Sequence, residues 1–278
     1  MATLRAVHTT ELHYAGEVAE SVNEVWLTPS QTERQRVERA WITTIPDAEL
    51  VGHEDAYGNR VTWFQIVERH ERLVVEAHAV VEVWAPQEPT ETGWEQIGDA
   101  AYADRFADFL APSRHVRWPA PIATFADELE LDESRGPLNW LRELERRINE
   151  TVRYAPGSTG VETAVEEVVH ARRGVCQDLA HIAIAIWRHR GVPARYVSGW
   201  LYEPGAEGPV ESHAWVEAHL GPSGWIEIDP THPGMIHDRY VQLAVGRDYA
   251  DVAPLRGSYV GPPTAEMEVR VVIEGDSS

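Results

Sequence analysis

The hydrophobic pattern of the chain changes from strand-like to helical and back again, and this change limits the fold more than any other feature. Residues 3–84 are rich in β-branched and aromatic residues and are interrupted by turn sequences such as Asp55–Asn59. Several short strands separated by turns predict an antiparallel sandwich. The segments that read as strands are 4–14, 21–27, 61–67 and 73–84.

The rest of the chain combines helices with strands, so we expect an α+β protein of two domains. Helical spacing predicts helices at 100–110, 138–152, 163–172 and 178–189, and strand-like alternation returns at 194–202, 212–220, 225–229 and 268–273. The segment 86–93 is the predicted linker. We expect a β-sandwich-like domain over 1–90, and a core over 91–278 whose helices pack on an antiparallel sheet and which includes the C-terminal strands.

Charge and composition restrict the partners. The formal net charge of −21 disfavours nucleic acid and anionic membranes as ligands. The first residues, Met1–His13, contain no apolar run, and no stretch approaches the roughly 20 apolar residues of a membrane span, so a cytoplasmic protein is expected. All 24 basic residues are arginine, so the chain has no lysine amine to offer in an amide-forming reaction.

The single cysteine, Cys176, is the predicted centre of the chemistry. Because the chain has one cysteine, it cannot form an intramolecular disulfide. Gly174 is a break signal, and Leu179, Ile182, Ala183 and Ile186 come after it at helical spacing. Cys176 is therefore expected where a loop enters a helix. Unpaired N–H groups and the positive end of the helix dipole at that position favour a thiolate and offer donors to an oxyanion.

A histidine and an aspartate are expected to meet across a hairpin. The segments 212–219 and 225–229 both alternate, and the turn sequence Leu220–Gly224 separates them. If the hairpin is centred near Gly221, His213 faces Asp229, with the pairs Trp215–Glu227 and Glu217–Trp225 on the same face. An aspartate there can hold one imidazole nitrogen and leave the other free to act as a base.

Other candidate residues are assigned structural roles. His219, His232 and His237 with Asp238 fit no standard metal-site spacing, and we interpret them as solvated loop residues. His181, about one helical turn after Cys176, is expected to pack or to support the site, and Trp140 is expected in the core. No cofactor and no metal is predicted.

Four segments carry a family resemblance. They occur in the expected order over about 60 residues and resemble the core of the bacterial transglutaminase-like superfamily: Gly174–His181, Gly191–Gly199, His213–Glu217 and Gly224–Thr231. The segment 245–257 resembles the stretch after that core in the family, and the segment 12–84 resembles the β-rich domain that precedes it. The resemblance implies a papain-like fold, with Cys176 as nucleophile, His213 as base, Asp229 as the residue that orients it, and an acyl-thioester intermediate on Cys176.

These residues predict a thiol-dependent enzyme that acts on amide or peptide bonds of a protein or peptide substrate. Water resolving the thioester gives a cysteine peptidase or amidase, which is the favoured outcome; an amine gives a protein-glutamine gamma-glutamyltransferase. Acyl transfer to a small amine is a further alternative. The main competing hypothesis is a non-catalytic binding module with a vestigial triad. Gln177 and Asp178 match the family motif without an assigned role, and the backbone N–H of Cys176 is the candidate oxyanion donor.

Overall fold

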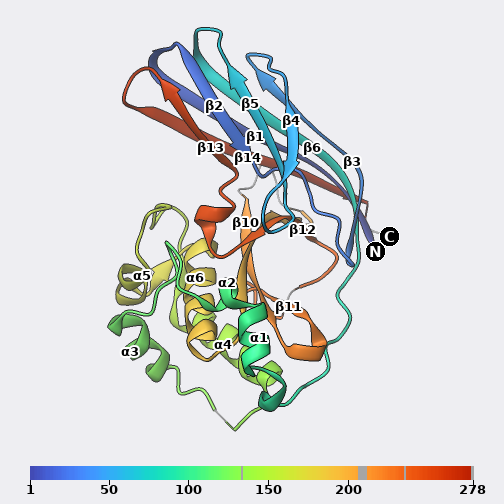
Figure 1. Cartoon of the computed structure of the whole chain (residues 1–278), viewed down its shortest axis with the longest axis vertical. Helices are drawn as coiled ribbons and strands as arrows, with labels where there is room; N and C mark the ends of the chain where they lie inside the picture. Colours follow the sequence, from blue (N-terminus) through green and yellow to red (C-terminus); the bar gives the residue numbers. More distant parts are fainter. Residues whose placement is uncertain (133, 206–211, 235, 277–278) are drawn as a thin grey trace.

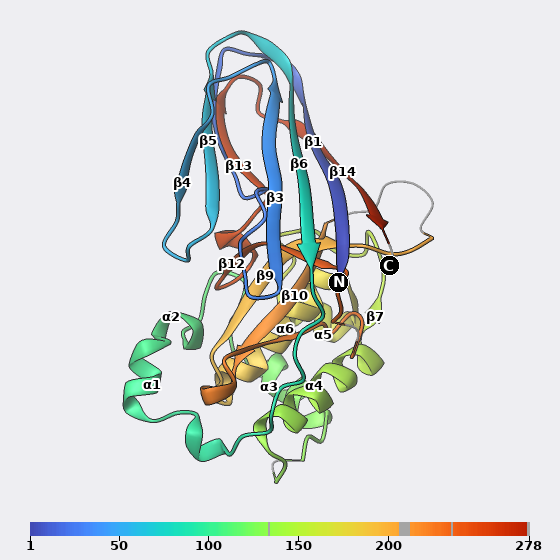
Figure 2. The same cartoon turned by 90° about the vertical axis from the view of Figure 1, so that its right-hand side faces the viewer.

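A computed structural model describes residues 1–132, 134–205, 212–234 and 236–276. Figure 1 shows a strand-rich part above a part that contains the helices, and Figure 2 shows the same division after a quarter turn. Among the described residues, no helix is long and apolar enough to cross a membrane.

The strand-rich part is a sandwich of two antiparallel four-stranded sheets, ordered β14-β1-β6-β3 and β13-β2-β5-β4. Its strands are β1 (Ala2–Val18), β2 (Glu20–Val25), β3 (Gln35–Ile45), β4 (Val51–Glu54), β5 (Arg60–Ile66), β6 (His70–Val83), β13 (Leu255–Val260) and β14 (Ala265–Asp276). Along β6, every second side chain from Leu73 to Val83 is buried between the sheets, as the period of a strand requires. The predicted antiparallel sandwich is present.

The C-terminal strands differ from the expected domain division. The sequence assigned them to the core over residues 91–278, whereas β14 pairs with β1, with Ala6 opposite Ile273, and β13 pairs with β2. Both therefore complete the N-terminal sandwich (Figure 1). Strand pairing depends on distant partners, and nothing in the local pattern of 268–273 specifies which sheet it joins.

The core places its helices against a four-stranded antiparallel sheet of order β11-β10-β9-β12. The helices are α1 (Ala100–Arg105), α2 (Ala107–Leu110), α3 (Ala120–Glu128), α4 (Pro137–Thr151), α5 (Val165–Ala171) and α6 (Cys176–His189). The strands are β9 (Ala194–Leu201), β10 (His213–His219), β11 (Trp225–Ile228) and β12 (Tyr240–Gly246). A separate short parallel pair, β7 (Arg153–Tyr154) and β8 (Arg173–Gly174), contacts α4, α5 and α6. Three short 3₁₀ helices complete the core: η1 (Trp94–Gln96), η2 (Gly221–Ser223) and η3 (Tyr249–Asp251).

Helix α6 is the central element of the core. Its side chains from Gln177 to Arg188 are all buried, and it contacts β9 and β10 as well as α3, α4 and α5. A helix buried on all sides has little freedom to shift. The residue at its first position, Cys176, is therefore held on a rigid element. Trp140 of α4 is 2% exposed and packs in the same core, as predicted.

Two buried amides of the sandwich bind the outer edge of the core sheet. The Gln35 side chain donates to the carbonyl of Gln242 at 2.8 Å and accepts from its N–H at 2.8 Å. The Asn59 side chain does the same with Val245, at 2.8 Å for both bonds. These amides supply the hydrogen bonds that a further strand beside β12 would make. The sandwich thus fixes the position of the core sheet.

Candidate active site

Cys176 lies at the first position of α6, where the sequence placed it. Val175 before it is extended, with φ −110° and ψ 179°. The N–H groups of Cys176 and Gln177 belong to the first helical turn, where the helix itself offers no acceptor. The cysteine is half-buried, so its sulfur lies at a helix N-terminus and is not sealed in the interior.

Asp178 fixes the junction between the loop and the helix. Its carboxylate accepts the N–H of Val175 at 2.8 Å and the hydroxyl of Thr159 at 2.6 Å. A carboxylate at this helix position commonly reaches back to the start of the helix. A Cβ at Gly174 would lie 2.8 Å from the Asp178 side chain, so only glycine fits there. The motif residue Asp178 therefore positions Cys176.

His213 and Asp229 meet, but through a register that differs from the predicted one. The structure pairs Val216 with Ile228 and Glu217 with Glu227, which is two residues away from the expected Glu217–Trp225 pairing. The turn is centred one residue later, because the N–H of Leu220 donates to the carbonyl of Gly224 at 2.9 Å.

A shift of two residues leaves every side chain on the same face of the sheet. His213 consequently reaches Asp229 from a diagonal position. The distance between His213 Nε2 and Asp229 Oδ2 is 2.8 Å.

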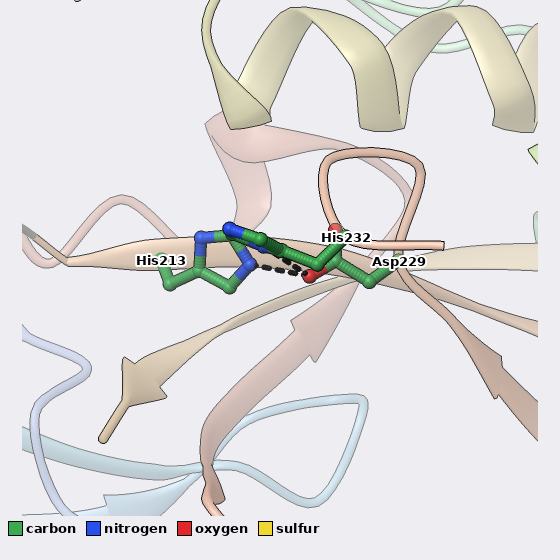
Figure 3. Close-up of side chains that lie close together, drawn as sticks. All are labelled: His213, Asp229 and His232. Carbon is green, nitrogen blue, oxygen red and sulfur yellow. Dashed lines mark hydrogen bonds and ion pairs between the residues drawn. The ribbon is translucent and has the colours of Figure 1, made fainter. Parts of the chain in front are cut away.

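The Asp229 carboxylate is fully buried and receives four hydrogen bonds. Oδ2 accepts from His213, from the Tyr240 hydroxyl at 2.8 Å and from His232 Nδ1 at 3.1 Å. Oδ1 accepts the N–H of Thr231 at 2.8 Å. Figure 3 shows both imidazoles directed at the same carboxylate. A carboxylate with this many donors stays ionised and fixed in orientation.

A second buried carboxyl group, that of Glu145 on helix α4, holds the backbone of Asp229 in place. Glu145 Oε1 accepts the N–H of Asp229 at 3.0 Å and the N–H of Gly234 at 3.4 Å. Burial raises the pKa of Glu145 to about 8, although these two N–H groups oppose the shift. Glu145 is therefore neutral at neutral pH and does not compete with Asp229 for the proton of His213. No spacing pattern along the chain indicated this contact.

The imidazole of His213 holds its proton at neutral pH. Burial by itself would lower its pKa, but the charge of Asp229, the hydrogen bond to Asp229 and a hydrogen bond with Cys176 together raise the pKa to about 10. Burial would raise the pKa of Asp229, but His213 and His232 hold it well below its usual range. Since Nε2 is bonded to Asp229, Nδ1 is the nitrogen left for the sulfur of Cys176.

The other histidines considered in the sequence analysis lie in different environments. His219 ends β10 inside an aromatic cluster, and its Nδ1 lies 2.9 Å from the Tyr102 hydroxyl. His237 is exposed, and His232 lies in a loop with 30% of its side chain exposed but contacts Asp229. The interpretation of all three as solvated loop residues is therefore wrong for His219 and incomplete for His232. His181 is buried, and its Nε2 accepts the N–H of Tyr249 at 3.2 Å, which is a packing role.

Three of these side chains could also ligate a metal. The ligand atoms of His213, Asp229 and His232 all lie within 4.8 Å of one another, and imidazole with carboxylate is a donor set that suits zinc. The same atoms already form the hydrogen bonds to Asp229. These bonds account for the cluster, and we interpret it as a hydrogen-bonded network.

The fold and the arrangement of these side chains define a transglutaminase-like core. Residues 124–230 match the transglutaminase-like superfamily, and residues 4–82 match the bacterial transglutaminase-like N-terminal region. The chain belongs to the transglutaminase-like superfamily. The predicted membership and the predicted α+β fold with an N-terminal β domain are confirmed.

Relatives include an uncharacterized protein of Mycobacterium leprae, 34% identical over 278 residues that cover 97% of this chain and 98% of the relative. A protein-glutamine gamma-glutamyltransferase of Pseudomonas aeruginosa is 30% identical over 145 residues, which cover 47% of this chain but only 21% of that enzyme. Among solved structures, a candidate cysteine protease from Cytophaga hutchinsonii superposes with a TM-score of 0.78 at 22% identity, covering 100% of this chain and 92% of the other. That likeness establishes the fold.

Proposed function

We propose that the protein is a thiol-dependent hydrolase of amide or peptide bonds, with Cys176 as nucleophile, His213 as acid and base, and Asp229 as the residue that orients it. The observation that carries this proposal is the position of the His213 ring, which bonds Cys176 on one side and Asp229 on the other. Nucleophile, base and orienting group in contact are the three parts that covalent acyl transfer needs.

The proposed reaction has two halves. The Cys176 sulfur attacks the carbonyl carbon, and the backbone N–H of Cys176 supports the oxyanion. His213 then gives its proton to the leaving amine as the C–N bond breaks, which leaves an acyl-thioester on Cys176. In the second half, neutral His213 takes a proton from water, and the resulting hydroxide displaces the sulfur. The products are a carboxylic acid and the restored pair of Cys176 and protonated His213.

We prefer hydrolysis to amine transfer because the similarity to a candidate protease covers more of this chain than the similarity to a transferase does. The candidate cysteine protease from Cytophaga hutchinsonii shares the whole arrangement of sandwich and core. The gamma-glutamyltransferase resembles less than half of this chain. That partial similarity keeps glutamine-specific transfer to an amine as the second candidate. If the protein does transfer acyl groups, it cannot cross-link itself through lysine, since the chain contains none.

Turnover in H₂¹⁸O tests both candidates at once. A panel of peptide, glutamine and ester substrates is incubated with the protein, with and without a primary amine. The masses of the products are then measured by mass spectrometry. Hydrolysis places one ¹⁸O in the new carboxylate, whereas transfer consumes the amine. Cys176→Ala should abolish turnover, because no other thiol is present. Turnover by Cys176→Ala at the wild-type rate would refute the assignment.

A further inference from the structure

His232 is brought onto Asp229 by the turn that comes after β11. In the sequence Asp229-Pro230-Thr231-His232, the N–H of His232 donates to the carbonyl of Asp229 at 3.0 Å, which closes a β-turn. Aspartate at the first position and proline at the second are the residues that such a turn favours. The turn directs the fourth side chain back over the first. The imidazole of His232 therefore lies next to the carboxylate of Asp229 for a local reason.

The side chain of His232 is not needed to close this turn. The backbone bond from His232 closes it, the Thr231 N–H bonds Asp229 Oδ1 at 2.8 Å, and Glu145 holds the N–H groups of Asp229 and Gly234. Asn149 of α4 also donates to the carbonyl of Thr231 at 2.9 Å. The loop is thus fixed at its backbone, and the His232 imidazole has another role.

That imidazole acts on the same oxygen that holds His213. His232 Nδ1 lies 3.1 Å from Asp229 Oδ2, His213 Nε2 lies 2.8 Å from it, and the two rings are 5.4 Å apart at their centres (Figure 3). One carboxylate oxygen shared by two imidazoles divides its charge between them. The donor on His232 therefore limits both the direction in which Oδ2 points and the strength with which it holds the proton of His213.

We propose that His232 is a positioning residue of the site, which orients Asp229 toward His213 by donating Nδ1–H to Oδ2. This inference rests on the proposed roles of Cys176 and His213. Among the described residues, the other titratable groups near the His213 imidazole include Cys176 from α6 and Tyr240 from β12, with Glu145 of α4 next to Asp229. The ring of Trp215 stacks against the His213 imidazole. His232 has 30% of its side chain exposed, so it can be replaced without opening a large cavity.

The test compares His232→Leu with His232→Asn. Leucine removes the donor, whereas the Asn Nδ2 atom occupies nearly the place of the histidine Nδ1 and keeps an N–H toward Oδ2. The first readout is the rate of Cys176 alkylation by iodoacetamide at pH 7, measured by intact mass, because the chain has one cysteine. The second is the low-field NMR resonance of the His213 Nε2–H proton.

We expect His232→Leu to slow alkylation about tenfold, the effect of one hydrogen bond to a charged group, and to shift or broaden the His213 resonance. His232→Asn should stay within about twofold of wild type in rate and keep the resonance. The matched control is His237→Leu, a histidine to leucine change at an exposed loop position, which should change neither readout. His232→Ala replaces the leucine variant if circular dichroism shows that the latter is unfolded.

Two results would overturn the proposal. If the leucine variant matches wild type in both readouts, His232 does not position Asp229. If the asparagine variant behaves like the leucine variant, the imidazole acts by packing and not by donation. Neither readout requires a substrate, so a wild-type protein that hydrolyses no amide would count against the proposed function while leaving the test of His232 intact.

Discussion

The two ends of strand β10 each carry a buried histidine, and the two have opposite properties. His213 and His219 are both 9% exposed, and both lie on the face of the sheet that carries Trp215 and Glu217. Yet the pKa of His213 is raised to about 10, whereas the pKa of His219 is lowered to about 4. Burial lowers the pKa of both. The difference is that His213 has the Asp229 carboxylate as its partner, while His219 has the Tyr102 hydroxyl and nearby arginines.

For these two histidines of equal exposed fraction, the partner decides whether the pKa of the imidazole ends above or below its ordinary value. In His181 of helix α6, burial lowers the pKa to about 3 although the charge of Asp248 opposes the shift, and the ring serves as an acceptor for a backbone N–H. A protonated imidazole next to the only thiol is what the proposed reaction needs in order to protonate a leaving amine. A neutral one, such as His219, could not perform that step.

Replacing Asp229 should have the largest effect on activity, because it leaves His213, like His219, without a carboxylate partner. In Asp229→Asn, only the contact with Cys176 still opposes burial, so the pKa of His213 should fall far below about 10. The turnover number should drop about 10⁴-fold, as expected when the orienting carboxylate of such a triad is neutralised. Titration of the His213 ring by NMR and steady-state kinetics measure the two effects.

A suitable control is Asp248→Asn, which neutralises another buried carboxylate of the core, one that accepts the N–H of His115. It should leave the titration of His213 in place. A raised pKa of His213 that survived in Asp229→Asn would mean that Asp229 is not its cause.

Glu145 supports only the Asp229 end of the hairpin, and its loss should destabilise the protein. Glu145→Leu leaves the buried N–H of Asp229 without an acceptor, at about 1–3 kcal/mol, whereas the N–H of the exposed Gly234 can bind water instead. Glu145→Gln keeps the acceptor oxygen and removes the titration. Since the pKa of Glu145 rises from 4.5 to about 8 on folding, wild type should lose stability as pH increases from 4.5 to 8, and the glutamine variant should lose less, by on the order of a few kcal/mol.

Urea unfolding at pH 5 and pH 8 measures this difference for wild type and both variants. Equal pH slopes for wild type and Glu145→Gln would show that Glu145 is ionised in the folded protein. In that case, the Asp229 end would carry two negative charges.

Replacing His219 should have the smallest effect, which is on the pH dependence of stability. The contribution of His219 to that dependence is opposite in sign to the contribution of His213. The raised pKa of His213 contributes stability that is present below pH 6.5 and is lost as pH rises toward 10. The lowered pKa of His219 makes the unfolded state bind the proton more tightly, so stability is lost as pH falls from 6.5 to about 4. His219→Phe, which suits the surrounding aromatic rings, should reduce the acid-side loss by about 1 kcal/mol. Thermal unfolding midpoints between pH 4 and 6.5 would reveal whether wild type and variant instead have the same slope.

The sequence predicted the meeting of His213 and Asp229 although the predicted register was wrong. Alternation along both strands determines which face each side chain occupies, and a shift of two residues preserves that face. The turn centre could not be read from Leu220–Gly224, because several turn conformations suit that sequence. The position of Cys176 was easier to predict, since a glycine break before residues at helical spacing is a local signal.

The features that were missed depend on contacts between distant segments. Glu145 lies on an amphipathic helix far from Asp229 in sequence, and only the packing of α4 brings them together. His232 is close in sequence, but its contact results from a specific turn and not from a spacing pattern. Strand β12 is a nearly continuous apolar run broken by Gln242, so its sequence lacks the alternation by which the other core strands were found.

The first and last strands of the chain are neighbours in one sheet, with Ala6 opposite Ile273. The core is consequently an insertion between two parts of the sandwich and not a module joined at its end. A fragment starting at residue 91 would retain Cys176, His213 and Asp229. It would also leave β13 and β14 without partners and remove the Gln35 and Asn59 amides from β12. Bare strand edges of this kind promote aggregation, so a dissection of this protein is better attempted by circular permutation through its adjacent ends than by truncation.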